Sequence, residues 1–507
     1  MNALLNSMKN VSNYTRTENG ALTHKTTKSD LLDMFAMGAA MRTRSDEDVI
    51  LMFKKAFEEN PSYALKCLFY IRDVRGGQGE RRFFRVCMKW LASAHTEAAR
   101  RNLKHIPEFG RWDDLYVFEG TKLHYDAFDL MKEQFMLDLN CKTPSLLAKW
   151  LKSENASSYE SRRLGEITAK HFGLTHKQYR KYLATLRTRI NIVEKLMSEN
   201  RWDEIEFDKI PSKAGIIYKN AFARRDMIKA KYEKFAKDEN TKVNAGTLYP
   251  YEVVEKAINL MGSNRWYARN PVGLNNTDRL MINKYWDNLT DYFNGSNLNA
   301  LVMADTSGSM SGTPINVATS LALYTAEKAG GPFANHYISF SSRPQLIECE
   351  GVDFCDKVDR IVRTNLCENT NIEAAFDMLL NTAIRNRLSQ DDMPDTIIVV
   401  SDMEFDQGTR IGYRGYSYGY NSSSYTAEAD TLMESIAKRW KQMGYEMPHL
   451  IYWNVNARQN NIPMLGNGRI SYVSGFSPSI FQTIVTGKTG FQLMMEVLDG
   501  DRYSVIC

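Results

Sequence analysis

The sequence predicts a multidomain protein in which an all-α region precedes a C-terminal α/β region with a doubly wound parallel sheet. Two observations lead to this fold class. Up to about residue 262, apolar residues recur at three- to four-residue spacing and strand-like alternation is nearly absent, which indicates amphipathic helices. From about residue 298, short β-branched runs alternate with helical segments, which is typical of a parallel sheet with crossover helices.

The chain begins with a polar stretch rich in Asn and Thr, residues 1–27, for which we expect a flexible arm. The helices predicted after it include LLDMFAMGAAMR, DEDVILMFKKAFEEN, PSYALKCLFYIRDV, ERRFFRVCMKWLASAH and AFDLMKEQFMLDLN. Short connections such as GGQGE (76–80) and GRWDD (110–114) separate them. Consecutive helices joined by tight turns favour stacked helical hairpins, as in a HEAT-like repeat scaffold. We expect this domain and its connection to cover residues 28–290.

A connection rich in Gly and Asn, residues 263–297, marks the predicted domain boundary. The strands expected beyond it are LNALVMAD, ANHYISFSS, TIIVVSD, PHLIYWNVN and RISYVSG, alternating with helices such as PINVATSLALYTAEKAG and NIEAAFDMLLNTAIRN. This alternation predicts a Rossmann-like, doubly wound domain over residues 291–507. A Gly/Tyr/Ser loop, residues 408–425, interrupts the pattern. It is either a mobile lid whose tyrosines stack on bases or an insertion without a role.

The composition is ordinary for a globular protein in water, with 43% hydrophobic and 25% charged residues. No run of about 18 apolar residues occurs, so no transmembrane helix is expected, and no membrane partner. The N-terminus lacks the long apolar core and cleavage site of a secretory signal. Seven cysteines without a C-x-x-C pair favour reduced thiols in a cytoplasmic protein over a disulfide scaffold or a zinc site.

A candidate metal site begins at the first predicted strand of the α/β region. In LVMADTSGSM (301–310), an apolar run ends in Asp305, and the hydroxyls of Ser307 and Ser309 follow at alternate positions. Ligands bind doubly wound sheets at the carboxyl ends of the strands. A carboxylate with two hydroxyls suits Mg²⁺, or another divalent cation such as Mn²⁺ or Ca²⁺. Taken alone, the segment is equally well explained as a strand–turn–helix junction with Asp305 as a cap.

Two later segments supply further candidate ligands. The run TIIVVSD ends in Asp402, and Thr370 stands at the start of a predicted helix. The order Asp-x-Ser-x-Ser, then Thr, then Asp resembles the metal-ion-dependent adhesion site (MIDAS) of von Willebrand factor A domains, except that Asn369 replaces a usual Gly. The resemblance implies an open metal position that a partner carboxylate or a phosphate oxygen completes. The implied ligands are Asp305, Ser307, Ser309, Thr370 and Asp402.

Other segments resemble a family catalogued as domain of unknown function 2828. They are LFYIRDVRGGQGERRFF (68–84), IPEFGRWDDLYVF (106–118) and residues 185–222, and, in the C-terminal half, VVSDMEFDQ (399–407), LIYWNVNAR (450–458) and YVSGFSPSI (472–480). The order of helical repeats and a von Willebrand A domain is similar to that of the TROVE, or Ro autoantigen, RNA-binding proteins. That similarity implies a ribonucleoprotein whose repeats close into a ring passing single-stranded RNA ends and bind small structured RNAs outside.

Charge is distributed unevenly along the chain. Residues 1–290 contain 49 Lys and Arg against 36 Asp and Glu, whereas residues 291–507 contain 16 against 24. A basic half can attract nucleic acid. The excess is modest, however, and a solvated helical surface without a ligand accounts for it equally well.

Two basic clusters in the N-terminal half are candidate nucleic-acid contacts. Residues 170–189 contain no acid, and Phe172, Tyr179 and Tyr182 stand between their cations, a pattern that suits phosphate contact and base stacking. The second cluster flanks the GGQGE turn beside several acids, so an internal salt-bridge network is the slightly favoured alternative there. The candidate contacts are Lys170, Lys177, Arg180, Lys181, Arg187 and Arg189 in the first cluster and Arg72, Arg75, Arg81 and Arg82 in the second.

The sequence therefore predicts a non-catalytic binding protein. The first hypothesis is RNA binding by the basic helical scaffold, with a Mg-dependent adhesion site in the C-terminal domain. The alternative is a metal-dependent protein-interaction scaffold without RNA, in which the metal captures an acidic residue of a protein partner. Metal-assisted hydrolysis by Asp305 and Asp402 ranks third. Catalysis needs a poised base, and His171, His176 and His336 stand in other segments.

Overall fold

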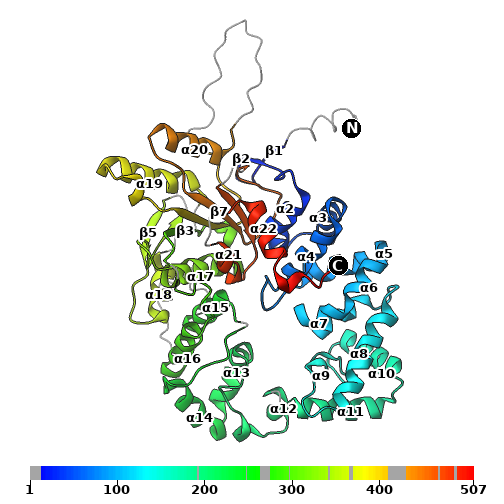
Figure 1. Ribbon diagram of the computed structural model, residues 1–507. Coiled ribbons are helices and arrows are strands. Elements are labelled where there is room, and N and C mark those ends of the chain that lie inside the picture. The colour runs from blue at the N-terminus through cyan, green and yellow to red at the C-terminus, as the bar shows by residue number, and fades with distance from the viewer. Residues whose placement is uncertain are drawn as a thin grey trace. The chain divides into compact units, whose positions relative to one another are not determined.

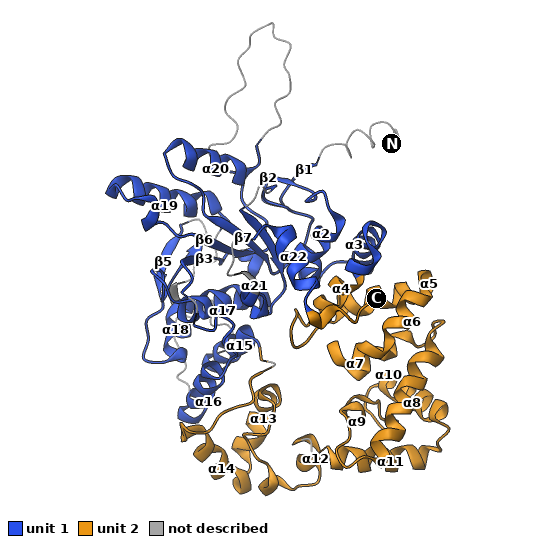
Figure 2. Cartoon of the chain, in the orientation of Figure 1, with its two compact units in different colours: residues 1–64, 249–500 blue, residues 65–248, 501–507 orange. Residues whose placement is uncertain are grey.

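The computed structural model describes residues 13–190, 193–246, 248–262, 275–295, 297–340, 343–364, 369–408, 430–465, 469–484 and 488–507. The chain divides into two compact units, coloured separately in Figure 2. Unit 1 comprises residues 1–64 and 249–500, and unit 2 comprises residues 65–248 and 501–507. Of the expected loop at 408–425, residues 409–425 lie outside the described residues.

Unit 1 contains a six-stranded sheet of order β5-β4-β3-β6-β7-β8 (Figure 1). The strands are β3 (Ala300–Asp305), β4 (His336–Phe340), β5 (Gln345–Glu348), β6 (Thr396–Ser401), β7 (His449–Asn454) and β8 (Ile470–Ser474). Neighbouring strands are parallel except β4 and β5, which are antiparallel. Every residue of β3, β6 and β7 is buried. Covering on both faces explains why these strands read as nearly continuous apolar runs.

The crossover helices place the switch point of the sheet beside the candidate metal residues. Helix α17 (Thr313–Lys328) follows β3 and contacts β3, β4 and β6. Helices α19 (Ile372–Asn386) and α20 (Leu432–Gln442) lie on the other face (Figure 1). The chain passes from β3 to β4 and then returns to place β6 on the opposite side of β3. Right-handed crossovers in opposite directions put their helices on opposite faces, and ligands bind such sheets where the direction reverses.

Several helices expected in the repeat domain belong to unit 1 instead. Ser474 Oγ of β8 donates a hydrogen bond to the Phe35 carbonyl in 2.8 Å, and the Trp286 and Phe354 rings stack with centroids 4.1 Å apart. The compact units thus divide the chain differently from the expected ranges 28–290 and 291–507, because these helices bury their apolar faces against the α/β layers. The remaining elements of unit 1 are β1 (Tyr14–Arg16), β2 (Leu22–His24), α2 (Asp30–Met37), α3 (Asp46–Glu59), α15 (Pro250–Met261), α16 (Asn276–Asp287), α18 (Phe354–Thr364), α21 (Phe481–Ile484) and α22 (Gly490–Leu498).

Unit 2 is entirely helical in the residues that the structure describes, apart from turns and one isolated bridge. Helix α8 contacts α10, α10 contacts α11, and α13 contacts α14, as expected for stacked helical pairs. The predicted fold class is thereby confirmed: a helical repeat unit and a von Willebrand A-like α/β unit. The helices are α4 (Pro61–Arg72), whose first turn belongs to unit 1, α5 (Arg82–Ala94), α6 (Thr96–Asn102), α7 (Ile106–Phe109), α8 (His124–Asn140), α9 (Leu147–Trp150), α10 (Tyr159–Phe172), α11 (His176–Arg189), α12 (Val193–Ser198), α13 (Ser212–Arg224) and α14 (Asp226–Lys237).

Local sequence explains where the basic helix α11 begins. The Thr175 side chain accepts a hydrogen bond from the Gln178 backbone N–H, and the Gln178 side chain accepts one from the Thr175 backbone. This capping box satisfies two N–H groups that the helix itself leaves free. The preceding helix α10 ends at Phe172, and its C-cap residue, Gly173, has a φ of 72° in the left-handed region, where glycine carries no steric penalty.

None of the helices in the described part of the chain is both long and apolar enough to cross a membrane. All described cysteines are free thiols.

Candidate metal centre and basic helical surface

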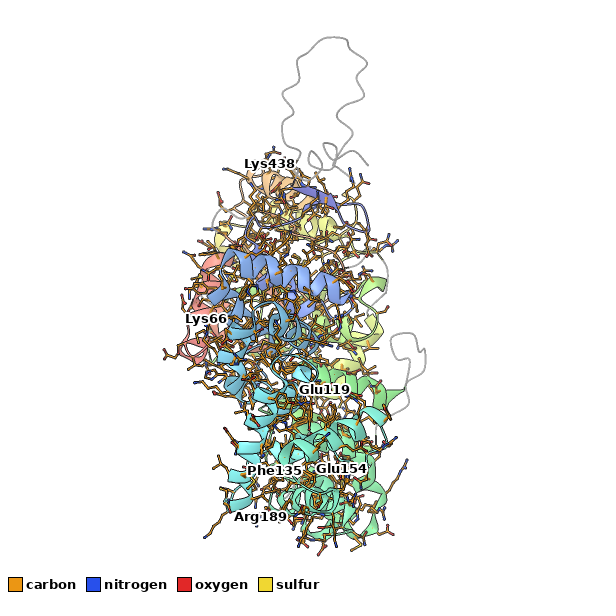
Figure 3. All side chains as sticks on the ribbon, turned by 90° about the vertical axis from the view of Figure 1, so that its right-hand side faces the viewer. Lys66, Glu119, Phe135, Glu154, Arg189 and Lys438 are labelled. Carbon is orange, nitrogen blue, oxygen red and sulfur yellow. The ribbon has the colours of Figure 1, made fainter. Side chains whose placement is uncertain are left out.

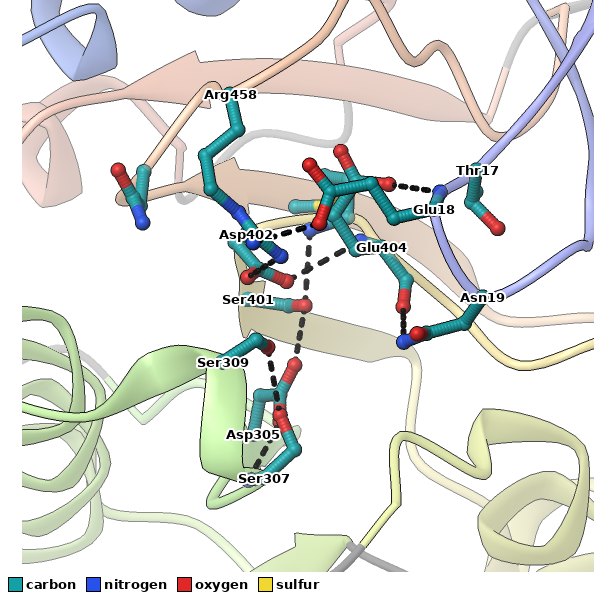
Figure 4. A network of polar contacts seen from close by, with 12 residues as sticks. Thr17, Glu18, Asn19, Asp305, Ser307, Ser309, Ser401, Asp402, Glu404 and Arg458 are labelled. Carbon is teal, nitrogen blue, oxygen red and sulfur yellow. Dashed lines mark hydrogen bonds and ion pairs between the residues drawn. The ribbon is translucent and has the colours of Figure 1, made fainter. Parts of the chain in front are cut away.

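Asp305 is the central carboxylate of the candidate metal site and is fully buried at the carboxyl end of β3. Its Oδ1 accepts a hydrogen bond from the Ser307 backbone N–H (2.9 Å), and its Oδ2 accepts one from the Ser401 hydroxyl (2.6 Å), as Figure 4 shows. No described basic side chain forms an ion pair with it. Burial, and after it the negative charge of Asp402, raise the pKa of Asp305 well above its ordinary value.

The two serines link Asp305 to the second carboxylate. The hydroxyl oxygens of Ser307 and Ser309 lie 3.1 Å apart, and the neighbouring Ser309 hydroxyl lowers the pKa of the Asp402 carboxyl. Asp402 follows β6 and is only 1% exposed. Burial raises the pKa of Asp402, and the Ser309 hydrogen bond and the positive charge of Arg458 oppose that rise. Asp305, Ser307 and Ser309 therefore form one hydrogen-bonded set, and the negative charge of Asp402 acts on Asp305.

The fifth predicted ligand, Thr370, comes from the loop before α19. Its side chain is buried, and its carbonyl accepts a hydrogen bond from the Asp406 backbone N–H (3.0 Å). The next residue, Asn371, caps α19 by accepting a hydrogen bond from the Ala374 backbone N–H. The structure thus joins the Thr370 loop to the loop that carries Asp402.

Two charged residues that sequence reasoning did not assign to the site stand beside Asp402. Arg458 Nη2 donates to Asp402 Oδ2 in 3.0 Å, and Nη1 lies 2.6 Å from a Glu18 carboxylate oxygen (Figure 4). Glu404 accepts hydrogen bonds from the Glu18 backbone N–H (2.7 Å) and the Asn461 side chain (2.8 Å), and burial raises its pKa to about 7. The alternating acids of the segment DMEFD were the available signal for Glu404, whereas nothing in the sequence singled out Arg458.

The described part of the expected N-terminal arm is structured and lies over this site. Strands β1 and β2 pair as an antiparallel hairpin. Between them, Thr17 Oγ1 donates to the Phe405 carbonyl and Asn19 Nδ2 to the Glu404 carbonyl, both in 2.6 Å. The prediction of a flexible arm is therefore wrong for residues 13–27, because their polar side chains bond to the loop after β6 instead of to water.

The donor set fits a hard divalent cation. Asp305 and Asp402 are two buried carboxylates that repel each other, and serine hydroxyls lie beside them. A bound cation would offset the cost of burying both negative charges. The described residues contain no cluster of three His, Cys, Asp or Glu side chains able to hold a metal. A cation here would therefore depend on hydroxyl ligands, which is the mixed oxygen chemistry of the predicted site.

The structure exposes most of the first basic cluster. Lys170, Lys177 and Lys181 are exposed, and none of them forms an ion pair with a described acid. Arg189 is exposed and donates to the Leu139 carbonyl. Figure 3 labels Arg189 at the edge of the helical unit.

Other members of this cluster do not have the expected exposure. Phe172 and Tyr179 are buried in the helical core, so they cannot stack on bases. Arg187 donates to the Ala148 and Leu151 carbonyls (both 2.9 Å) and to Ser153 Oγ (2.8 Å). Arg187 therefore braces α11 against the segment that includes α9.

The second basic cluster is mostly internal. Arg72 is 1% exposed and donates through Nε and Nη2 to Asp114 Oδ2, at 2.9 and 2.7 Å. Arg75 donates to the Glu108 carbonyl, and Arg81 is exposed. Arg82 is half-buried. For Arg72 the salt-bridge alternative is correct.

The histidines considered as bases bond elsewhere. His171 pairs with Asp129 (2.7 Å), and His176 pairs with Glu154 (2.6 Å). His336 Nδ1 lies 2.8 Å from the Ala334 carbonyl. None of these hydrogen bonds reaches Ser307.

The fold and this site define a protein that combines a von Willebrand A-like α/β unit with a helical repeat unit. The chain belongs to the family described as "Domain of unknown function (DUF2828)", whose model matches residues 17–119 and 136–296. A second model, "Domain of unknown function (DUF7788)", matches residues 299–501. The C-terminal segments that resembled the first family thus fall within the range of the second model.

Two further similarities span nearly the whole chain. An uncharacterized protein, L728 of Acanthamoeba polyphaga mimivirus, is 27% identical over 540 residues, which cover 96% of this chain and 88% of that protein. The crystal structure of the Deinococcus radiodurans Ro (RSR) protein aligns with a TM-score of 0.42 at 12% identity, covering 94% of this chain and 100% of the other.

Proposed function

We propose that unit 2 binds single-stranded or small structured RNA through α10 and α11, while unit 1 binds a divalent cation at the carboxyl edge of its sheet. The observation that carries the RNA proposal is the row of exposed cations on α11, a helix whose own sequence contains no acid. Lys177 and Lys181 are one helical turn apart, so they share a face of the helix, and Lys170 lies in the last turn of α10. We call these three residues with Arg180 the basic face.

The charge of the compact units supports this assignment. Unit 2 contains 37 Lys and Arg against 25 Asp and Glu, whereas unit 1 contains 28 against 35. An RNA strand that neutralises its phosphates on the basic face releases counterions, which gives affinity that falls steeply with salt. The excess of acids in unit 1 repels a polyanion, so the positively charged unit 2 is the better surface for RNA.

The test measures binding of a fluorescein-labelled single-stranded RNA by anisotropy across a salt series. Replacing Lys177, Arg180 and Lys181 together by Ala should weaken binding and reduce the slope of log K against log salt by about 2, at about 0.7 per lost phosphate contact. The matched control is Lys122→Ala, an exposed lysine of the same unit outside the basic face. Equal slopes for the wild type and the triple variant would refute the proposal.

For the metal site, we propose that Asp305, Ser307, Ser309, Thr370 and Asp402 hold Mg²⁺, directly or through water. The cation would supply an electrophilic position for a carboxylate or phosphate oxygen of a partner. The chain's own contribution is orientation: Ser401 fixes one oxygen of Asp305, and Arg458 fixes one of Asp402. Because the hydroxyls would be ligands and no described base forms a hydrogen bond with Ser307, we propose adhesion without catalysis.

The same geometry favours a second candidate function, capture of an acidic protein partner without RNA. Calorimetric titration with Mg²⁺ or Mn²⁺ should give binding by the wild type, a loss of at least about tenfold in Asp305→Ala, and no change in Asp391→Asn, an exposed acid of unit 1. Undiminished cation binding by Asp305→Ala would contradict the metal assignment. Sequencing co-purified RNA and identifying proteins released by chelation would then separate the two functions.

A further inference from the structure

Unit 2 contains a cavity of about 560 Å³. It lies among α9, α11, α12 and the segment after α9, and all its lining residues belong to unit 2. Its volume falls in the range of pockets for small organic ligands. Trp150, Leu183 and Ala184 contribute apolar surface to it.

The cavity carries an excess of cations and two carboxylate oxygens without a described hydrogen bond. Four cations line it, with two acids, Glu154 and Glu194. One oxygen of each acid, Oε2, is buried and accepts no hydrogen bond from a described residue, whereas Glu154 Oε1 is 2.6 Å from His176 Nδ1. Glu154 is 4% exposed at its side chain, and Figure 3 shows it among the packed side chains of this unit. The four cations are Lys149, Arg180, Arg187 and Lys195.

The cations differ in how firmly they are held. Arg187 is fixed by three hydrogen bonds. Arg180 is 54% exposed, and its Nη1 is 3.7 Å from Glu154 Oε2, beyond hydrogen-bond distance. Lys149 stands 3.8 Å from Glu194. In loose pairs of this kind the cation can still bind an anionic group. The buried carboxylate oxygen also lacks the hydrogen bond that buried polar atoms ordinarily have.

These features select one ligand chemistry. The ligand must be flat and apolar enough for the Trp150 wall, anionic at one end for the exposed cations, and rich in N–H donors for the carboxylates. We infer that the cavity receives one unstacked guanine nucleotide of a bound RNA strand. Guanine offers adjacent N–H donors on its Watson–Crick edge, and single-stranded RNA is read by such edges and by stacking. Arg180 turns from Glu154 to the phosphate when the base enters. The inference rests on the proposed RNA-binding function.

The position of Arg180 links the cavity to the RNA surface. Arg180 belongs both to the basic face and to the cavity wall. A strand bound along Lys177 and Lys181 therefore passes the mouth of the cavity, since both lysines lie on the same helix as Arg180.

The test compares GMP, AMP and CMP in calorimetric titrations of the full-length protein. GMP should bind at least about tenfold more tightly than AMP or CMP, because the others lack its paired donors. Ala184→Trp fills the cavity from an exposed helix position and should weaken GMP binding at least about tenfold without removing a native contact of the side chain. Glu154→Gln, with a similar shape, should abolish the preference for GMP over AMP. Lys122→Ala should match the wild type.

Labelled oligonucleotides separate this inference from the proposed function. A U-only strand reports the basic face, and a strand with one G should bind at least about fivefold more tightly in the wild type and equally in Ala184→Trp. Binding of the U-only strand with no GMP binding and no effect of Ala184→Trp would overturn the guanine pocket and leave the proposed function intact. GMP binding without RNA binding would overturn the proposed function and the RNA role of this cavity.

Discussion

Asp114 holds the buried charge of Arg72, and its removal should be among the most destabilising single changes in unit 2. Arg72 and Asp114 are 1% and 0% exposed, and the Arg72 guanidinium makes both its charge-assisted bonds to Asp114 Oδ2. Arg85 Nε donates to the other oxygen in 2.7 Å, and the Arg111 backbone N–H also donates to Oδ2 in 2.9 Å. Asp114 therefore accepts hydrogen bonds from four N–H donors, and all four lose their acceptor when its carboxylate is removed.

The magnitude follows from which charge is left behind. Asp114→Ala strands Arg72 in the interior without an anion, and breaking a buried pair in this way costs about 3–5 kcal/mol. The partly exposed Arg85 still has an ion pair with Asp113, 3.1 Å away. It therefore adds little to the loss of stability. By contrast, Glu160→Ala removes only a surface partner of Arg163, and exposed ion pairs of this kind contribute little to stability.

Hydrogen exchange measured on peptides from α4 and α5 reports the opening free energy of this region directly. Asp114→Ala should lower it by the amount above, while the double variant Arg72→Met, Asp114→Leu should recover part of the loss because no buried charge remains. An opening free energy of Asp114→Ala within about 1 kcal/mol of the wild type would refute the assignment of Arg72 as an internal ion-pair residue.

Two other predictions concern unit 1. Burial, and after it the positive charge of Arg469, lower the pKa of His449 to about 4. Below about pH 6.5 the unfolded state therefore binds a proton at this histidine that the folded state does not bind. The free energy of unfolding should fall by about 1 kcal/mol per pH unit from about pH 6.5 toward about pH 4. Urea titrations at several pH values should show that the free energy of unfolding falls less with decreasing pH in His449→Gln than in the wild type. The same pH dependence in both proteins would contradict this prediction. Ser401→Ala should weaken Mn²⁺ binding about 10- to 100-fold in calorimetry, since Ser401 orients Asp305, whereas the exposed Ser389→Ala should not; unchanged binding would remove Ser401 from the site.

The strands of the sheet and the edge of the candidate site were predictable from sequence. A buried strand such as β6 needs apolar residues on both faces, so its run of β-branched residues and its end at an acid are visible without a structure. Asp305 and Asp402 follow two such runs, and the rule that ligands bind where strand order reverses placed them together.

Long-range contacts were not predictable in the same way. The N-terminal residues 13–27 read as an arm because polar composition does not distinguish bonding to water from bonding to a distant loop, and their partners lie almost 400 positions away. The arginines around the GGQGE turn were equally ambiguous, since charge in the sequence does not reveal whether an acid such as Asp114 faces it.

The amino-acid sequence alone was enough to infer the two architectures, the buried strands, the candidate metal ligands and the excess of positive charge in the helical half. Each depends on local periodicity or on short motifs, which neighbouring residues encode. Three features became visible only in the three-dimensional contacts. Helices from both ends of the repeat region belong to unit 1. Phe172 and Tyr179 are core residues, and Glu154 Oε2 lies at a cavity without a described hydrogen bond. The reason is physical: burial and hydrogen-bond partners depend on which surfaces meet across the chain, and those contacts join residues that no local pattern relates.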